Sequence, residues 1–297
     1  MKPIKKHSSK KFIERGNLSD LPHNIARSKI KGYLEGFIQG LVNEYKSREI
    51  VQPDSASEYL SRRSSKGELK PFQAALIPPE LIRINQFERG LSTRLGNSVE
   101  ECARIIAQDY YPTVHRGYDI TAQVSITAFA EAERQKEQYE SAAKGGQAKP
   151  SFEEMIIAML NARRSDDLEE KQVRADLYIQ TDDGRELIFE IKSPKPNKGQ
   201  CLEILQRLLR FHLLRGDNSA QVQAYYAMPY NPYGSTKADY KWSQALNYLP
   251  FEETVVIGQN FWLILGGETT YEELLEIYLE VGHDKSKSML DSLAFEF

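Results

Sequence analysis

The chain has 297 residues, 40% hydrophobic and 27% charged, which is ordinary for a globular protein with a sizeable core. Its formal net charge of −3 argues against a histone-like protein that binds nucleic acid through bulk positive charge, without excluding basic residues gathered in one cleft. Two widely separated cysteines indicate neither a disulfide framework nor a zinc site, and the lack of a signal peptide or a membrane-length apolar run leads us to expect a cytoplasmic protein that contacts no membrane.

The N-terminal part is predicted to be a basic arm followed by helices. Residues 1 to about 20 carry five lysines that are able to contact phosphate, although a frayed terminus explains them equally well: Lys2, Lys5, Lys6, Lys10 and Lys11. Apolar residues recur at helical spacing from Asn24 to Arg48, which predicts a core-packing helix. Residues 55–70 are polar and predict a short helix and an exposed loop, and Pro78-Pro79 marks the boundary of the next module.

A carboxylate pair stands in the next informative stretch, residues 86–107. We expect Gly96 and Asn97 to break the chain and Asn97 or Ser98 to cap a helix that begins there. Glu100 would lie beside the buried face of this helix, from which it can reach a site packed against it. The alternative is that Glu100 and Glu101 are first-turn acids favoured by the helix dipole. Residues 119–163 also look helical, with a loop at Gly145-Gly146, and residues 165–171 read as a charged connector.

Two runs of alternating apolar and polar residues predict a β-hairpin within residues 173–192. Thr181-Asp182-Asp183-Gly184 between them is typical of a tight turn, with Gly184 in the left-handed conformation. A three-residue loop would pair Thr181 with Arg185, and counting outward then puts Asp176 opposite Glu190 on one face. A two-residue loop would separate these carboxylates. Lys192, two residues beyond Glu190, points the same way.

Two carboxylates and an ammonium on one face are costly unless a cation compensates for them. Asp176 and Glu190, to which the carbonyl of Ile191 could add a third donor, make a hard oxygen site that suits Mg²⁺. Lys192 would then hold or help deprotonate an attacking water. The alternative is an exposed hairpin face with a Glu-Lys pair of little energetic value.

Basic and amide side chains follow the hairpin. Pro194 and Pro196 end the strand, so that Lys195, Lys198 and Gln200 lie near the start of a helix, where a phosphate is favoured. A strand over residues 220–228 leads into a loop whose aromatic, amide and basic groups are of the types that contact bases and DNA backbone, although packed tyrosines are an equal alternative. The expected DNA contacts there are Asn231, Tyr233, Lys237 and Lys241. Residues 255–257 predict a short buried strand and 271–281 a helix.

Asp176 with Glu190-Ile191-Lys192 resembles the motif of the PD-(D/E)xK nuclease superfamily, although Ala175 stands where the name puts proline. The wider pattern FERGLSTRLG with EECARIIA, FEIKSPKPNKGQ, YNPYG and YKWS resembles type II restriction endonucleases of the TdeIII kind over about residues 70–280. The resemblance implies an α/β fold with a mixed central sheet flanked by helices, an N-terminal arm and helical region over residues 1–75, and a catalytic domain over 76–297. In this family pattern a helix carries a further Glu near the metal, and Glu100 matches it best, with Glu101 second.

The same resemblance implies a homodimer that uses Mg²⁺ to hydrolyse double-stranded DNA, leaving 5′-phosphate ends at a short GC-rich palindrome such as GGNCC. Two other functions stay open. A structure-specific or repair nuclease would have the same site without a sharp sequence preference. A DNA-binding protein with a vestigial site would bind without cutting, but the intact Asp176, Glu190 and Lys192 argue against it.

Overall fold

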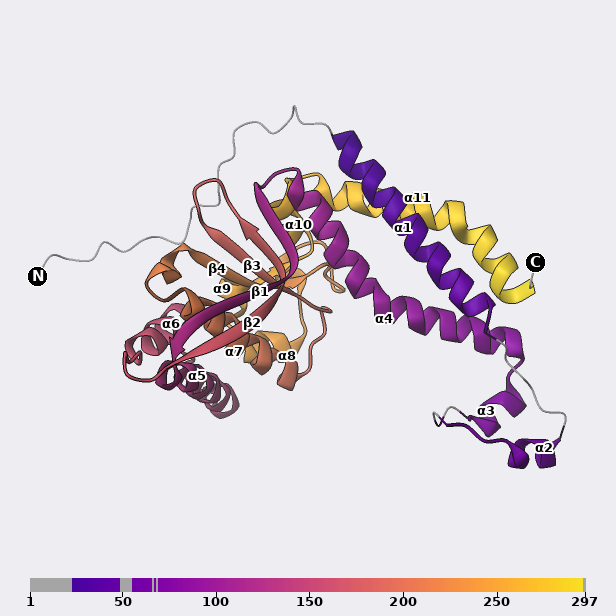
Figure 1. The fold of residues 1–297 in the computed structure, drawn as a ribbon, viewed down its shortest axis with the longest axis horizontal. Helices are drawn as coiled ribbons and strands as arrows, with labels where there is room; N and C mark the ends of the chain where they lie inside the picture. The colour runs from indigo at the N-terminus through magenta and orange to yellow at the C-terminus, as the bar shows by residue number, and fades with distance from the viewer. Residues whose placement is uncertain (1–22, 49–54, 66, 68, 296–297) are drawn as a thin grey trace, which may run out of the picture.

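The computed structural model describes residues 23–48, 55–65, 67 and 69–295 (Figure 1). The five lysines of the predicted basic arm lie outside this part of the chain. None of the described helices is both long enough and apolar enough to span a membrane.

A five-stranded sheet forms the centre of the fold, in the spatial order β1-β2-β3-β4-β5. The pairs β1–β2 and β2–β3 are antiparallel, and the pairs β3–β4 and β4–β5 are parallel. Parallel neighbours need crossover connections, which α7 provides between β3 and β4. The predicted α/β architecture with a mixed sheet is therefore confirmed. The strands are β1 (Thr113–Ser125), β2 (Leu168–Gln180), β3 (Glu186–Ile191), β4 (Val222–Met228) and β5 (Val255–Ile257).

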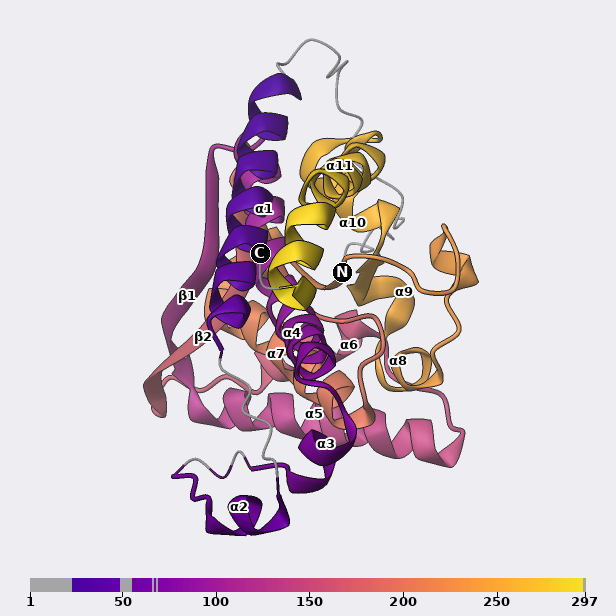
Figure 2. The ribbon, with the colours of Figure 1, turned by 90° about the vertical axis from the view of Figure 1, so that its right-hand side faces the viewer.

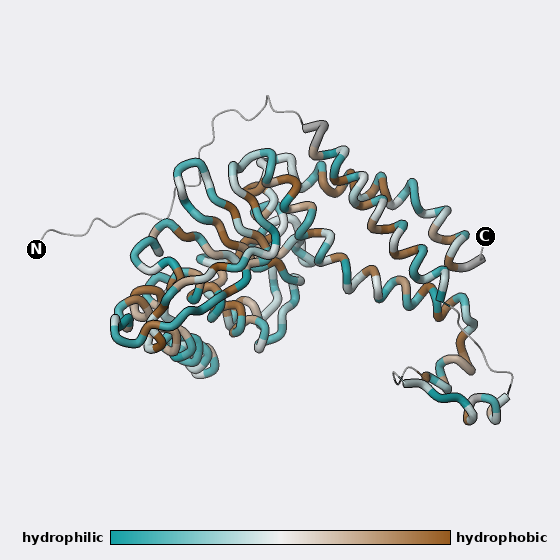
Figure 3. The backbone as a smooth tube through the Cα atoms, in the orientation of Figure 1, coloured by the Kyte–Doolittle hydropathy of each residue, from teal (hydrophilic) through white to brown (hydrophobic). Residues whose placement is uncertain are grey.

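Helices cover both faces of the sheet, and the apolar strands lie between them (Figure 3). One face packs against α5 (Ile126–Gly145), α6 (Phe152–Asn161), α7 (Lys198–Arg215), α8 (Ser243–Tyr248) and α9 (Phe251–Thr254). The other face packs against α1 (His23–Lys46), α4 (Pro79–Gln108), α10 (Gln259–Gly266) and α11 (Thr270–Leu290). Short helical turns complete the chain at η1 (Gly216–Gln221), η2 (Lys237–Asp239) and η3 (Asp291–Phe295).

Helices α1, α4 and α11 extend beyond the sheet as a bundle, with α2 (Ala56–Ser61) and α3 (Pro71–Leu76) at its far end (Figures 1 and 2). A separate small core, which includes Leu41, Tyr45 and Phe87, holds the bundle together. Ile30 and Leu34 of α1 share the sheet core with Phe189 and other strand residues. The N-terminal helix thus packs directly on the part of the chain that carries the sheet, and the predicted domain boundary near residue 76 stays a prediction.

The predicted break at Gly96-Asn97 is wrong, because α4 runs from Pro79 to Gln108 without interruption. Ser98, expected as a cap, is fully buried within the helix, where its hydroxyl donates to the carbonyl of Leu95 at 2.9 Å and lies 3.3 Å from the hydroxyl of Tyr278 on α11. Burial of apolar side chains before and after Gly96 outweighs a glycine penalty of about 1 kcal/mol.

The prediction of helix from residue 119 is also wrong, because β1 continues to Ser125, whose hydroxyl accepts the backbone N–H of Ala128 and caps α5. Ile120 and Val124 are four residues apart, a spacing that fits one face of a helix as well as a strand. Pairing with β2 decides between them, and the same pairing draws Leu168–Lys171, read as a connector, into β2. Helices α1, α2, α6, α7 and α11 and strands β3, β4 and β5 lie close to where the sequence predicted them, although α11 is longer than expected. Helices α3, α8, α9 and α10 were not foreseen.

Candidate functional site

The hairpin of β2 and β3 has the register that the turn chemistry predicts. The backbone N–H of Thr181 donates to the carbonyl of Arg185 at 2.9 Å, and Gly184 has φ of 81°. Leu177 pairs with Phe189, so the next pair outward along the same register is Asp176 and Glu190. The three-residue loop is therefore confirmed, and it brings the two carboxylates side by side.

Asp176 lies at a kink between β1 and β2. Gly117, which falls between the register pairs on either side of Asp176, has φ of 64°, a conformation that disrupts a regular ladder. The two neighbours of Asp176 pack into different layers: Ala175 joins the core of α5, α6 and α7, whereas Leu177 joins the core of α1, α4 and α11. At Asp176, therefore, the side chains of β2 change from one helix layer to the other. The Asp176 carboxylate lies within reach of groups from both layers.

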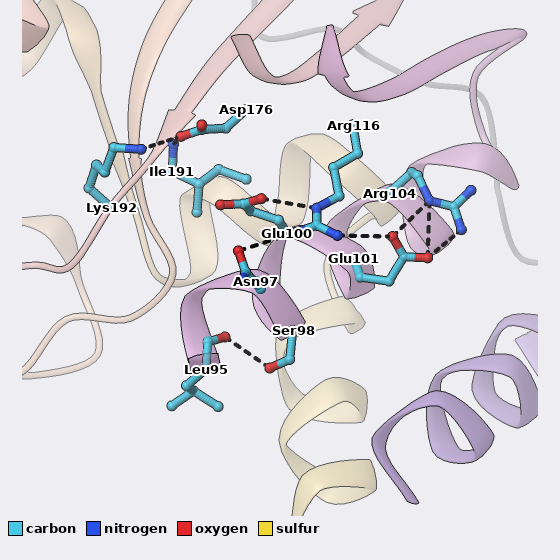
Figure 4. A network of polar contacts seen from close by, with 10 residues as sticks. All are labelled: Leu95, Asn97, Ser98, Glu100, Glu101, Arg104, Arg116, Asp176, Ile191 and Lys192. Atoms are coloured by element: carbon cyan, nitrogen blue, oxygen red, sulfur yellow. Dashed lines mark hydrogen bonds and ion pairs between the residues drawn. The ribbon is translucent and has the colours of Figure 1, made fainter. Parts of the chain in front are cut away.

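Asp176 is held by the end of β3. Its Oδ2 atom accepts the backbone N–H of Ile191 at 2.8 Å and the ammonium of Lys192 at 2.7 Å (Figure 4). The side chain of Lys192 is 44% exposed, so its ammonium lies at the solvent side of the carboxylate. This arrangement fixes the orientation of Asp176 and leaves Lys192 accessible to a ligand.

Glu190 is a fully buried carboxylate. The Nε atom of Arg207 on α7 lies 3.0 Å from its Oε1, and the ammonium of Lys192 lies 3.8 Å from its Oε2. Within the described part of the chain, neither carboxylate oxygen accepts a hydrogen bond. Burial, and next the charge of Asp176, raises the pKa of Glu190 to about 8, against the opposing effect of Arg207 and Lys192. Glu190 thus has lone pairs that none of the described protein groups uses.

Glu100 of α4 reaches the same site from the opposite layer. Its Oε2 accepts the Nε–H of Arg116 on β1 at 2.9 Å, and Figure 4 shows its carboxylate turned toward Asp176 and Ile191. Burial raises the pKa of Glu100, and the charge of Asp176 acts in the same direction. Glu101 lies on the other side of Arg116, 3.8 Å from its Nη1, and is bound by Arg104. Of the two acids that the sequence left open, the structure therefore puts Glu100 at the site.

Three carboxylates and three cations make up this site, and the two members of each ion pair come from different parts of the fold. Lys192 lies closest to Asp176, Arg207 to Glu190 and Arg116 to Glu100. The sequence did not identify either arginine. Arg116 lies in the strand that was partly read as helix, and Arg207 reaches Glu190 only through the packing of α7 on the sheet.

Asp176 and Glu190 supply hard oxygen donors of the kind that a divalent metal needs. The described residues contain no group of three or more His, Cys, Asp or Glu side chains arranged to hold a metal. Mg²⁺ is commonly bound by only one or two carboxylates and completes its shell with water and substrate phosphate. Asp176 and the two unpartnered oxygens of Glu190 fit that kind of partial site.

Lys195 lies on the exposed surface next to the site. Its ammonium is 5.3 Å from the ring of Tyr233 and 5.8 Å from that of Trp242. The two loops are tied together, because the Tyr240 hydroxyl donates to the carbonyl of Pro194 and the Trp242 indole N–H to that of Pro196. Lys241 is exposed on the same loop. The loops thus present aromatic and basic groups together.

The remaining predicted DNA contacts bind other parts of the protein. Lys198 donates to Glu140 at 2.8 Å, and the side chain of Gln200 completes the capping box at the start of α7. Asn231 folds its own loop, because its amide donates to the carbonyl of Thr236. Lys237 donates to the carbonyls of Phe251 and Val255, and burial lowers its pKa. These side chains have structural roles in this state of the protein.

Comparison with known proteins independently supports the family resemblance that the sequence suggested. A family model described as type II restriction endonuclease, HinfI, matches residues 26–282. The type II restriction enzymes HgiEI and HgiBI of Herpetosiphon aurantiacus are each 45% identical to this chain over 91% of its length and 97% of their own. HgiCII of the same organism is 44% identical over 91% of this chain and 98% of its own. The resemblance to type II restriction enzymes is confirmed, and the matching family model is the HinfI one, where the sequence had suggested the TdeIII kind.

Proposed function

The chain belongs to the HinfI family of type II restriction endonucleases, and from that premise we propose that Asp176, Glu190 and Lys192 form its catalytic centre, in a core of the PD-(D/E)xK kind. The observation that supports this most strongly is the hairpin register, which aligns Asp176 with Glu190 and directs Lys192 to the same carboxylates. Glu100 is the fourth member, contributed by α4. The substrate is double-stranded DNA.

Mg²⁺ is the proposed cofactor, held by Asp176, Glu190 and the carbonyl of Ile191. Hard oxygen donors and unused carboxylate lone pairs support this choice. Bound there, Mg²⁺ would supply the positive charge that a phosphodiester needs as its negative charge builds up during hydrolysis.

Lys192 has the proposed role of positioning the attacking water. Its ammonium already donates to Asp176, and its exposure leaves further donors for a water or a phosphate oxygen. Asp176 and Glu190 hold the ammonium beside the proposed metal site, and the backbone N–H of Ile191 fixes the orientation of the Asp176 carboxylate. Attack on the phosphorus from the side opposite the 3′ oxygen would leave a 5′-phosphate and a 3′-hydroxyl.

DNA contacts are proposed for the surface beside the site. Lys195 and Lys241 would bind phosphates, and Tyr233 and Asn231 lie in the loop that could approach base edges. Lys198, Gln200 and Lys237 would need to exchange their present partners to reach DNA. A short GC-rich palindrome such as GGNCC is the proposed target, implied by the family resemblance.

A homodimer is proposed because cutting both strands of a palindrome calls for two copies of one site. We place the interface at α2 and α3, whose Leu60, Phe72 and Leu76 are 80%, 85% and 83% exposed. Clustered apolar side chains of this size usually mark an interaction surface. The exposed Leu275 and Leu279 of α11 are the proposed counterpart on the other copy. Glu272 is exposed beside them and could pair with Arg63 or Lys70.

Digestion of unmethylated phage DNA by the purified protein tests the proposed function. We expect discrete fragments with Mg²⁺ and intact DNA with EDTA, and mapping the fragment ends gives the target and the end chemistry. A smear that also needs Mg²⁺ would contradict sequence-specific cutting and favour a repair-type nuclease.

A further inference from the structure

Glu190 and Arg207 form an ion pair in which the buried carboxylate accepts no hydrogen bond from its partner. The Nε atom of Arg207 is within 3.0 Å of Glu190 Oε1, but it donates no hydrogen bond, and neither oxygen of Glu190 accepts one within the described residues. A buried pair that serves only the fold needs such bonds to offset the cost of removing its charges from water. Arg207 balances the charge of Glu190 while leaving its lone pairs unused.

Arg207 is anchored by a different atom. Its terminal NH2 group donates to the backbone carbonyl of Arg174 on β2 at 2.7 Å, and its side chain is 30% exposed. The bond to Arg174 keeps the guanidinium beside Glu190 when no other cation is present. The exposed portion gives it a path toward solvent, so the guanidinium can withdraw from Glu190 without unfolding α7.

We infer that Arg207 is a positioning residue that stands in for the divalent ion: it neutralises Glu190 in the metal-free enzyme and yields the carboxylate oxygens when the ion binds. This inference rests on the proposed metal-dependent function. Lys192 also faces Glu190, at 3.8 Å, but its shorter contact is with Asp176, so Arg207 is the closest cation to Glu190. The competing interpretation is a structural clamp that holds α7 on β2 through the Arg174 carbonyl.

The two interpretations predict different effects of replacing Arg207 on stability and on Mg²⁺ binding. The experiment uses the full chain without DNA at about pH 9, above the pKa of about 8 that burial gives Glu190, so that this carboxyl is ionised. It measures the melting temperature, Tm, with and without Mg²⁺, and the affinity for Mg²⁺ by calorimetry. The variants are Arg207→Met, which keeps the aliphatic part of the side chain without the guanidinium, Arg207→Lys, which keeps the charge, and Glu190→Gln alone and combined with Arg207→Met. Arg210→Met is the matched control, because Arg210 lies one turn further along α7 and stacks over Phe129 at 4.1 Å, away from Glu190.

Without metal, Arg207→Met should lower Tm by roughly 5 °C, because it leaves a buried carboxylate without its nearest cation. The same change should have a much smaller effect in Glu190→Gln, where no charge needs balancing. Mg²⁺ should raise the Tm of Arg207→Met by more than that of the wild type and bind about tenfold more tightly, since its competitor is gone. Arg207→Lys should restore wild-type behaviour, and Arg210→Met should respond to Mg²⁺ as the wild type does.

Equal Mg²⁺-induced shifts in wild type and Arg207→Met would overturn the inference, as would an equal loss of Tm in the Glu190→Gln background. A wild type whose Tm does not respond to Mg²⁺ would overturn it too. None of these measurements involves DNA. A protein that shows the predicted coupling but leaves DNA intact would therefore refute the proposed function and keep the role of Arg207.

Discussion

Asp176 and Glu190 are neighbours across the hairpin, yet each carboxylate is balanced by a cation from a different place. Asp176 lies 2.7 Å from Lys192 at the end of β3, whereas Glu190 lies 3.0 Å from Arg207 on α7. The first pair is hydrogen-bonded, whereas the second joins a buried carboxylate to a partly exposed guanidinium with no hydrogen bond between them. This asymmetry suggests that Asp176 is fixed in orientation before a ligand arrives, while Glu190 has free coordination capacity.

The stability of the metal-free protein should fall as pH rises from about 4.5 to about 8. In the fold the pKa of Glu190 is raised to about 8 from 4.5, so between these values the folded state binds a proton that the unfolded chain has lost. Raising the pH then favours unfolding. Melting curves in EDTA between pH 5 and pH 9 should show a steeper decline for wild type than for Glu190→Gln. Parallel declines would show that Glu190 does not titrate in this window.

Replacing Glu100 should reduce cleavage more than replacing its neighbour. Glu100→Gln removes a charge turned toward Asp176, whereas Glu101→Gln weakens an ion pair with Arg104 and a longer contact with Arg116. We expect Glu100→Gln to slow cleavage roughly 10- to 100-fold and Glu101→Gln to change it little. Single-turnover rates on a plasmid with one target measure both. The assignment is wrong if Glu101→Gln is the slower enzyme.

Replacing Lys195 should weaken DNA binding, whereas replacing Lys237 should lower the stability of the fold. Lys195→Ala should weaken DNA binding in Ca²⁺ and lower the slope of log affinity against log salt by about 1, as expected for one lost phosphate contact. Lys237→Met should instead cost roughly 1–3 kcal/mol of unfolding free energy, because it leaves the carbonyls of Phe251 and Val255 without their donor. An unchanged salt slope in Lys195→Ala would remove Lys195 from the DNA surface.

Charges introduced on α3 should separate the proposed dimer. Phe72→Glu combined with Leu76→Glu puts two carboxylates in the apolar surface of α3, so light scattering should report a monomer for the variant and a dimer for the wild type. Ile157→Glu on α6, also at an exposed apolar position, is the control and should stay dimeric. A variant that remains dimeric would place the interface elsewhere.

The sequence predicted the hairpin well because its information is local. Period-2 alternation and a Gly184 turn determine the register, and the register alone pairs Asp176 with Glu190. Features that depend on contacts between segments far apart in the sequence were predicted wrongly. Gly96 stays helical because Tyr278 and the two cores pack around its helix, and residues 119–125 form a strand because β2 pairs with them.

The same limit applies to the site. Glu100 was selected by its place in a motif and beside a helix face, whereas Arg116 and Arg207 carry no local pattern that ties them to a carboxylate. Their partners are set by the packing of β1 on α4 and of α7 on the sheet. A contact between side chains 16 or more positions apart in the chain has no signature in the spacing of either residue.

The most direct test of the central claim is the cleavage rate of Lys192→Ala beside that of Lys171→Ala. Both lysines follow strand carboxylates, but Lys171 pairs with Glu169 near the start of β2, away from Asp176. With Mg²⁺, Lys192→Ala should cut target DNA roughly 10²- to 10⁴-fold more slowly while binding it in Ca²⁺ as the wild type does, and Lys171→Ala should cut normally. Full cleavage by Lys192→Ala would contradict the assignment of the catalytic centre to this hairpin.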